Sequence, residues 1–242
     1  MTDKPAIVRR LDELKIDWRD FEAAAPQSRA ILAEICDDPR QLSDLMKHAT
    51  TREELRIMCE SHQLLDYLVV YDSLERGIRL RLHLATHDHL QRPHDHRFDF
   101  SSRILCGTYE HCLLAPKLDP YSLSDELHAI AYQDKDHPDP KINMTNDDFP
   151  AAFVRNERKG DTFTLGNQVS HTVLTTANTV SLVLRGPAQK RRSFIYDRTD
   201  QKLWWRFGRE DETTARRTSK TMTAEKIVST LTALADLNVI SI

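Results

Sequence analysis

The spacing of apolar residues divides the chain into a helical N-terminal part and a longer part rich in strands. Up to about residue 62, apolar residues recur every three or four positions, as at Ile31, Leu32 and Ile35, which is the spacing of one helix face. Pro26 and the Asp-Asp-Pro stretch at 37–39 interrupt this pattern. We therefore expect three or four short helices that pack on another part of the protein.

From about residue 67 apolar and polar residues alternate, which is the pattern of half-buried strands. The clearest case is 78–85, where Arg79, Arg81 and His83 alternate with apolar residues. Further short strands are predicted at 67–71, 98–105, 109–114, 127–132, 152–155, 162–165, 171–175, 179–184 and 192–196. Many short strands separated by turns predict a sandwich or a barrel.

The remaining segments look like additions to that barrel. Residues 116–150 are rich in proline and acidic residues and predict a long loop over the barrel. A charged stretch follows Trp204 and Trp205, which we interpret as packing anchors near a C-terminal helix at about 224–237. The predicted organisation is a helical segment at 1–62 packed on a barrel at 63–208, with an insertion at about 116–150, and a helical extension at 209–242.

Composition narrows the class of protein. The 242 residues carry a formal net charge of -3, with 40% hydrophobic and 29% charged residues, so neither nucleic acid nor an anionic membrane surface is expected as a partner. We see no apolar run of membrane-spanning length and no signal peptide at the start. The four cysteines have no Cys-x-x-Cys spacing, which favours reduced thiols and a cytoplasmic location.

Histidine is the unusual component, because six of the eleven histidines fall between His83 and His111. His94 and His96 are separated by one residue. On a strand such residues point to the same side, so both imidazoles can reach one metal ion. A metal site is therefore the leading hypothesis for this region, although a buried histidine is often only a hydrogen-bonded core residue.

The spacing around these histidines resembles the two motifs of the cupin superfamily. His94 and His96 stand at the expected distance from Gly107, whereas the glycine that would match His87 and His89 falls at 100 or 101. The second motif matches in spacing, with several identities changed, at Gly160, the Gly-Asn-Gln stretch at 166–168, His171 and Thr175. The resemblance implies a mainly β fold, the double-stranded β-helix or jelly-roll barrel, and a metal held by His94, His96 and His171.

One departure from the cupin pattern bears on the chemistry. Position 100, where the motif has an acid, is Phe100 and is expected to point inward with the histidines. The implied ligand set is then three neutral imidazoles with open positions, which suits catalysis more than a closed structural site. This arrangement is similar to that of the thiol dioxygenases among cupins, which use Fe(II) and dioxygen.

Several further residues are candidates for the surroundings of the ion. If the apolar face of 78–85 packs on the helices, Arg81 turns inward and can bind a substrate carboxylate, as arginine does in the similar thiol dioxygenases. Phe100 would wall the substrate pocket. Tyr109 and His111 share one strand face and are candidate catalytic groups, with a core tyrosine and histidine as the equal alternative. The competing carboxylate-binding residues are Arg92, Arg97 and Arg185.

Three classes of function remain open at this point. The first is a mononuclear non-haem iron oxygenase that acts with dioxygen on a small carboxylate-bearing substrate, a thiol or an amino-acid derivative. The second is a 2-oxoglutarate-dependent hydroxylase, although such enzymes usually have a carboxylate ligand. The third is a non-enzymatic ligand-binding cupin, and a zinc or manganese isomerase or lyase is also conceivable. A homodimer is possible in each case.

Overall fold

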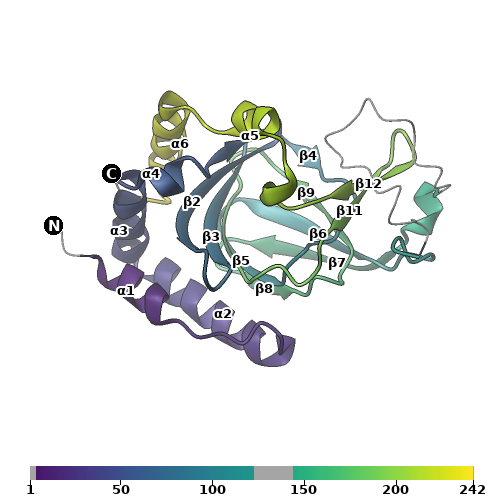
Figure 1. Ribbon diagram of the computed structural model, residues 1–242, viewed down its shortest axis with the longest axis horizontal. Coiled ribbons are helices and arrows are strands. Elements are labelled where there is room, and N and C mark those ends of the chain that lie inside the picture. The colour runs from purple at the N-terminus through teal and green to yellow at the C-terminus, as the bar shows by residue number, and fades with distance from the viewer. Residues whose placement is uncertain (1–3, 123–143, 242) are drawn as a thin grey trace.

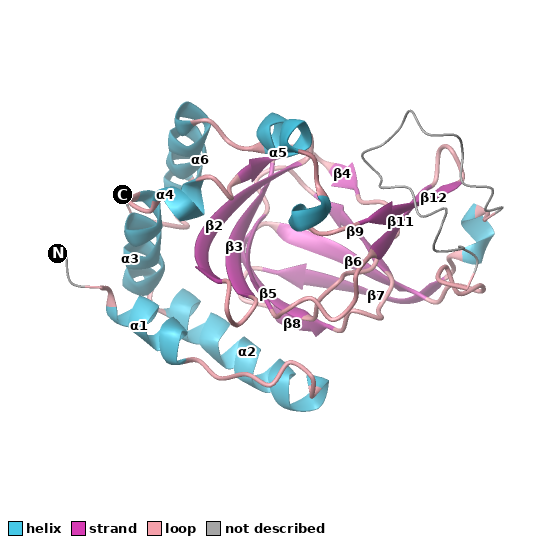
Figure 2. Cartoon of the chain, viewed as in Figure 1, coloured by secondary structure: helices cyan, strands magenta, loops and turns pink. Residues whose placement is uncertain are grey.

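The computed structural model describes residues 4–122 and 144–241, so the strand predicted at 127–132 lies outside the described residues. The described chain consists mainly of antiparallel strands, with helices at both ends (Figure 2). The predicted fold class, a mainly β barrel with terminal helices, is confirmed.

Two antiparallel sheets form the barrel. The six-stranded sheet has the order β1 (Glu60–Ser61), β2 (Leu65–Ser73), β3 (Ile78–Ala85), β10 (Val180–Arg185), β5 (Phe100–Cys106) and β8 (Thr162–Leu165). The four-stranded sheet has the order β4 (His89–Leu90), β9 (His171–Thr175), β6 (Thr108–Leu114) and β7 (Ala151–Arg158). The chain alternates between the two sheets from β3 to β6 and again from β7 to β10, which is the winding of a jelly roll. The pair β11 (Ser193–Asp197) and β12 (Lys202–Arg206) adds a two-stranded ribbon.

All the labelled helices except α5 (Thr214–Lys220) lie on the outside of the six-stranded sheet, beside β2, β3 and β5, whereas α5 lies over one end of the barrel (Figure 1). The N-terminal ones are α1 (Ala6–Glu13), α2 (Phe21–Asp37), α3 (Pro39–Thr50) and α4 (Glu53–Arg56). Aspartate residues cap the N-termini of α2 and α3: the Asp20 side chain accepts a hydrogen bond from the backbone N–H of Ala23, and the Asp38 side chain accepts one from that of Arg40. The C-terminal helices are α5 (Thr214–Lys220) and α6 (Ala224–Asp236), and single 3-10 turns occur at η2 (Asn146–Asp148) and η3 (Arg209–Asp211). None of the helices that the structure describes is long and apolar enough to span a membrane.

Two local expectations were wrong. Pro26 does not end a helix but lies inside α2, where Ser28 donates to the carbonyls of Ala24 and Ala25 and continues the turn. Trp205 is a packing anchor, but on β12 rather than against α6, since it belongs to a buried cluster with Phe194 and Tyr196 of β11.

The alternation of β3 positions polar groups inside the barrel. Leu80 and Leu82 are buried in the cluster formed with the helices, so Arg79, Arg81 and His83 face the barrel interior. The register of β10 with its neighbours places Val183 opposite both Arg81 of β3 and Ser102 of β5. A row of inward side chains therefore crosses the centre of the six-stranded sheet.

Candidate metal centre and adjoining cavity

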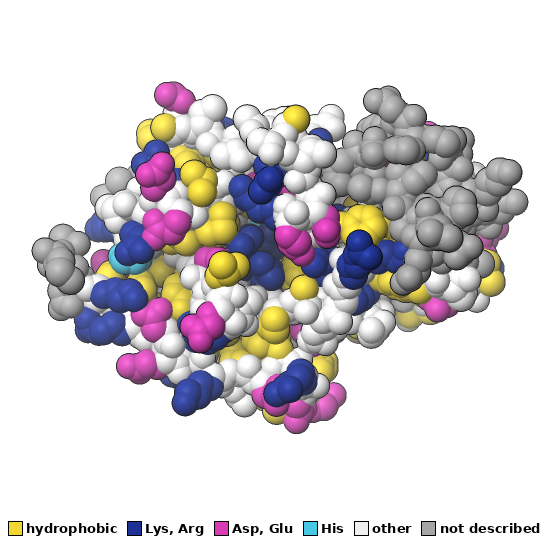
Figure 3. Space-filling view, viewed as in Figure 1, with side chains coloured by type: hydrophobic (Ala, Val, Ile, Leu, Met, Phe, Trp, Pro, Cys, Tyr) yellow, Lys and Arg dark blue, Asp and Glu magenta, His cyan; other side chains and the backbone are white. Residues whose placement is uncertain are grey.

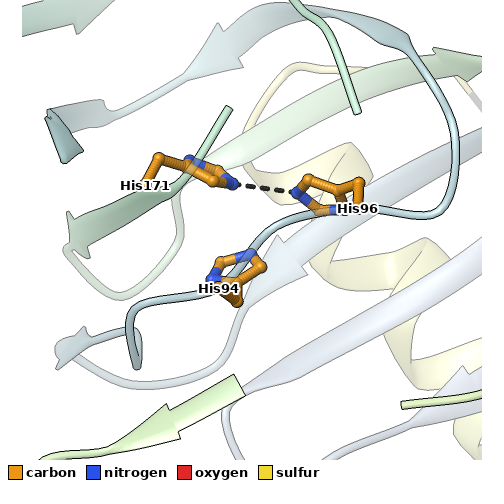
Figure 4. A group of neighbouring side chains, drawn as sticks. All are labelled: His94, His96 and His171. Atoms are coloured by element: carbon orange, nitrogen blue, oxygen red, sulfur yellow. Dashed lines mark hydrogen bonds between the residues drawn. The ribbon is translucent and has the colours of Figure 1, made fainter. Parts of the chain in front are cut away.

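Three histidines from two segments converge in the barrel (Figure 4). His171 is the first residue of β9, and the backbone of His94 pairs with it through two hydrogen bonds of 3.0 and 2.9 Å. His96 lies two residues further along the same loop. One ring nitrogen from each of the three residues lies within 4.8 Å of the others, so the structure brings the predicted ligands together.

Hydrogen bonds behind the rings assign which nitrogens face the centre. His94 Nδ1 donates to the Arg92 carbonyl at 2.7 Å, which leaves Nε2 with its lone pair. His171 Nδ1 donates to His111 Nε2 at 2.7 Å, and His111 Nδ1 donates to Glu157 Oε1 at 3.1 Å. This carboxylate–histidine–histidine chain orients His171 in the manner of an outer-shell partner of a metal ligand.

The donor geometry fits a metal ion. The Nε2 atoms of His96 and His171 face each other at 2.9 Å. Two imidazole nitrogens bound about 2.1 Å from one ion at a right angle are separated by about 3 Å, so the observed spacing is that of neighbouring ligands. Imidazole donors suit zinc, iron, copper and nickel.

Burial keeps the three rings neutral. It lowers the pKa of His94 to about 4, against a weaker opposing hydrogen bond to the Arg92 carbonyl. Burial also lowers the pKa of His96 and of His171 well below its usual value, and the charges of neighbouring groups add to the effect. Neutral imidazole is the form that binds a metal ion.

Phe100 lies where the cupin motif has its acid. Its ring packs edge-on against His96 with 4.7 Å between centroids, and it is buried. The metal-binding group found in the part of the chain that the structure describes contains only histidines. The set is therefore without charge, as the sequence led us to expect.

A cavity of about 240 Å³ adjoins the histidines. A second cavity of about 600 Å³ lies further out and shares His94 and Arg206 with the first. The inner cavity reaches the predicted residues Arg81, Arg97, Phe100, Tyr109 and Arg185. We call these the inner and the outer cavity.

The four candidate arginines differ in their partners. Arg81 makes no hydrogen bond to another described residue and lies 5.1 Å above the Tyr67 ring. Among the described residues, Arg185 donates hydrogen bonds only to the carbonyls of Gly77 and Gly186, and it lies 4.8 Å from the centroid of the Phe98 ring. Arg97, in contrast, is paired with Glu210 at 2.7 Å. Arg92 borders the outer cavity together with His94, does not line the inner one, and pairs with Asp197 at 2.7 Å, so its part in substrate binding stays a prediction.

The two candidate catalytic residues differ in position: Tyr109 lines the inner cavity and His111 does not. Tyr109 lines the inner cavity and hydrogen-bonds to Ser181 at 3.0 Å, and burial raises its pKa to about 12, so it remains protonated. His111 is fully buried and does not border the cavity, because its ring lies between His171 and Glu157. His111 therefore contacts His171 rather than the cavity, and its part as a catalytic group stays a prediction.

Three residues of the site were not anticipated. Glu157 lies near the end of β7, which runs to Arg158 rather than stopping at 155 as predicted. Ser102 follows Phe100 by two residues, and that alternation was a usable signal. Arg206 reaches the cavity from β12, a strand that the pattern did not predict.

The comparisons bear on the fold alone. No protein-family model matches the chain, and no curated protein does. Among solved structures, KdgF from Halomonas sp. is 13% identical, with a TM-score of 0.35 over 54% of this chain and 88% of that one. An RmlC-like cupin from Shewanella frigidimarina is 10% identical, with a TM-score of 0.35 over 55% and 85%. The DMSP lyase DddQ from Ruegeria pomeroyi is 12% identical, with a TM-score of 0.34 over 55% and 51%. Likeness at this level carries no information about the reaction.

Proposed function

We propose that this protein is a mononuclear iron oxygenase that acts with dioxygen on a small carboxylate-bearing substrate. The observation that carries the proposal is the convergence of three neutral imidazoles beside a cavity that contains arginines without carboxylate partners. Three protein ligands leave open positions on a metal ion, which suits catalysis. A bound ferrous ion would supply the activation of dioxygen.

The protein's own residues have distinct parts in this proposal. Arg81 and Arg185 bind the substrate carboxylate, since their guanidinium groups are charged and make no ion pair with an acid among the described residues. Tyr109, held protonated, offers a hydrogen-bond donor at the cavity wall. Phe100 shields His96 from solvent and leaves the centre without a fixed negative charge.

The charge of the centre favours an anionic substrate over a neutral one. Three neutral ligands leave the double positive charge of the ion unbalanced within a buried site. A thiolate, or the amine and carboxylate of an amino-acid derivative, would balance it. This is why we propose those substrate classes.

The test combines metal content with oxygen consumption. The purified protein, loaded with Fe(II) under anaerobic conditions, is expected to bind one equivalent of iron and to consume dioxygen with some members of a panel of thiols and amino acids. The variant His171→Ala should lose both the iron and the uptake, because it removes one ligand of three. His87→Ala is the matched control, since His87 is exposed and lies outside the cluster, and it should keep both.

Two outcomes would refute the proposal. Full iron occupancy in His171→Ala would show that His171 is not a ligand and would refute the three-histidine site. A protein that binds Fe(II) but consumes no dioxygen with any member of the panel would favour a ligand-binding cupin or a non-oxidative enzyme instead.

A further inference from the structure

The inner cavity contains more positive charge than its acids balance. Each acid at its wall already has a basic partner: Glu60 pairs with Arg209 and Lys220, Glu210 with Arg97, Glu212 with Lys220, and Asp95 with Lys190. Arg79 pairs with Asp72 at 2.6 Å. Three arginines of the lining remain without a carboxylate partner among the described residues: Arg81, Arg185 and Arg206. Figure 3 shows lysine and arginine side chains gathered around a hollow on this face of the molecule.

These arginines occupy two places. Arg185 stands opposite Arg79 in the β3–β10 register, two residues along from the pair of Arg81 and Val183, so Arg81 and Arg185 are diagonal neighbours on adjacent strands. Their proximity shows in the pKa of Arg185, which burial and then the charge of Arg81 lower to about 9. They form one cationic place on the six-stranded sheet.

Arg206 forms the second place, beside the histidines. It comes from β12, outside the six-stranded sheet, and borders both the inner and the outer cavity. It lines both cavities together with His94, and it lines the inner cavity together with His96 and His171. The two cationic places therefore come from different elements, one from β3 and β10 of the six-stranded sheet and the other from the ribbon strand β12.

Polar atoms along the inner cavity also lack partners. Arg81 Nε, His83 Nε2 and Ser102 Oγ are buried, line this cavity, and make no hydrogen bond within the described chain. Buried polar atoms are normally paired, so each indicates contact with a polar molecule. Arg81 and Ser102 flank Val183 in one row across three strands, which places these atoms along one wall.

We infer that the substrate is a dicarboxylate, with one carboxylate bound by Arg81 and Arg185 and the other directed to Arg206 beside the histidines. This inference rests on the proposed function for the metal centre and names the class of its substrate. Planar guanidinium groups match carboxylates in bidentate geometry, and separated cationic places match two carboxylates better than one compact anion. A short dicarboxylate fits a cavity of about 240 Å³.

The test measures binding to the metal-free protein by isothermal titration calorimetry. The probes are the dicarboxylates from malonate to adipate, butyrate as a monocarboxylate, and inorganic phosphate. At least one dicarboxylate is expected to bind about tenfold or more tightly than butyrate, because it meets both cationic places.

Three variants locate the two carboxylates. Arg206→Met should weaken the preferred dicarboxylate about tenfold and leave butyrate unchanged, whereas Arg81→Met should weaken both. Arg29→Met removes the same charge from the exposed face of α2 and should change neither. Thermal unfolding of each variant without ligand checks that it is folded.

Three results would overturn the inference: butyrate binding as tightly as the best dicarboxylate, phosphate binding more tightly than all of them, or unchanged dicarboxylate affinity in Arg206→Met. An absence of binding across the whole dicarboxylate series would do the same. Because the assay uses neither iron nor dioxygen, a protein that fails the oxygen-uptake test can still pass this one, and the two failures are distinguishable.

Discussion

At the scale of single residues, Arg81 shows how a side chain suited to ligand binding can lower the stability of the folded protein. Its Nε atom is buried without a hydrogen-bond partner, no carboxylate of the described residues pairs with it, and burial lowers its pKa to about 10. An unpaired buried charge costs free energy in the folded state, and that cost is offset only when a ligand supplies the opposite charge. The residue is therefore expected to be favourable for binding and unfavourable for stability.

Replacing Arg81 by methionine should stabilise the protein without ligand. Arg81→Met keeps most of the side-chain volume and removes the charge, so the free energy of unfolding should rise by about 1 to 3 kcal/mol. The change in the free energy of unfolding is measured by denaturant unfolding of the metal-free variant and wild type. Arg29→Met, at an exposed position, should stay within about 0.5 kcal/mol of the wild type. A less stable Arg81→Met protein would show that the charge has a stabilising partner.

Glu157 contacts His111, which in turn contacts His171 of the proposed metal site. The variant Glu157→Gln removes the carboxylate charge behind His111 and weakens the orientation of His171, so metal affinity should fall about 10- to 100-fold. A competition titration with a chelator measures the affinity, and thermal unfolding of the metal-free variant separates this effect from loss of structure. Glu110→Gln, exposed on the neighbouring strand β6, is the matched control. Equal affinities in the two variants would refute the role.

At the scale of elements, Gly107 determines how β5 turns into β6. Its φ is +75°, and a Cβ built there would lie 2.4 Å from Thr179 Oγ1 and 2.8 Å from Thr179 Cα. Any side chain at position 107 would therefore clash with the backbone of Thr179, and it would also require a backbone conformation that L residues rarely adopt. The glycine that marks the end of the first motif is explained by this close approach to the residue before β10.

The variant Gly107→Ala should lower the free energy of unfolding by about 3 kcal/mol or more, since backbone strain and a steric clash add. Gly160→Ala is the control for strain alone, because Gly160 also has a positive φ, of +94°, but its Cβ would meet nothing within 4 Å. The difference between the two variants, measured by denaturant unfolding, isolates the clash. Equal losses would mean that Thr179 moves aside at no cost.

The elements that the sequence predicted well are those with a local signal. The boundaries of β3, β8 and β9 match the predicted ranges, because alternation over several residues can be read without knowledge of neighbours. The short strands β1 and β4 were not predicted, since two residues carry no period. Contacts between residues far apart in the sequence could not be predicted either. Arg92 forms an ion pair with Asp197, 105 residues later, and nothing in the sequence near Arg92 indicates this contact.

At the scale of the whole molecule, Glu60 ties the C-terminal extension to the barrel. Its carboxylate, on β1, contacts Lys220 of α5 at 3.0 Å and Arg209 at 3.2 Å, and it hydrogen-bonds to His62 at 3.0 Å. Burial alone would raise the pKa of Glu60, but the bond to His62 and the charge of Lys220 outweigh it and lower the pKa to about 2. The ionised form is thus favoured by folding.

This shift predicts an acid-sensitive contribution to stability. With a pKa of about 2 in the folded protein and about 4.5 in the unfolded chain, the contribution is present above pH 4.5 and is lost as the pH falls toward 2. Its full size is of order 3 kcal/mol.

Glu60→Gln should therefore be less stable than the wild type at pH 6 and nearly equal to it at pH 2, in denaturant unfolding at both pH values. The control Glu53→Gln, exposed at the start of α4, should follow the wild type throughout. A constant difference between Glu60→Gln and the wild type across this range would contradict the role of ionised Glu60.

The two backbone hydrogen bonds between His94 and His171 make the donor set a product of folding rather than of metal binding. Removal of the ion by a chelator should then leave the barrel intact, unlike a zinc finger, which unfolds without its metal. The positions of His94 and His171 would then be set by the backbone before an ion binds. The site would accordingly select ions by how well their size and preferred ligand angles match the fixed positions of the three histidines. Exchange of one metal ion for another would need no rearrangement of the chain.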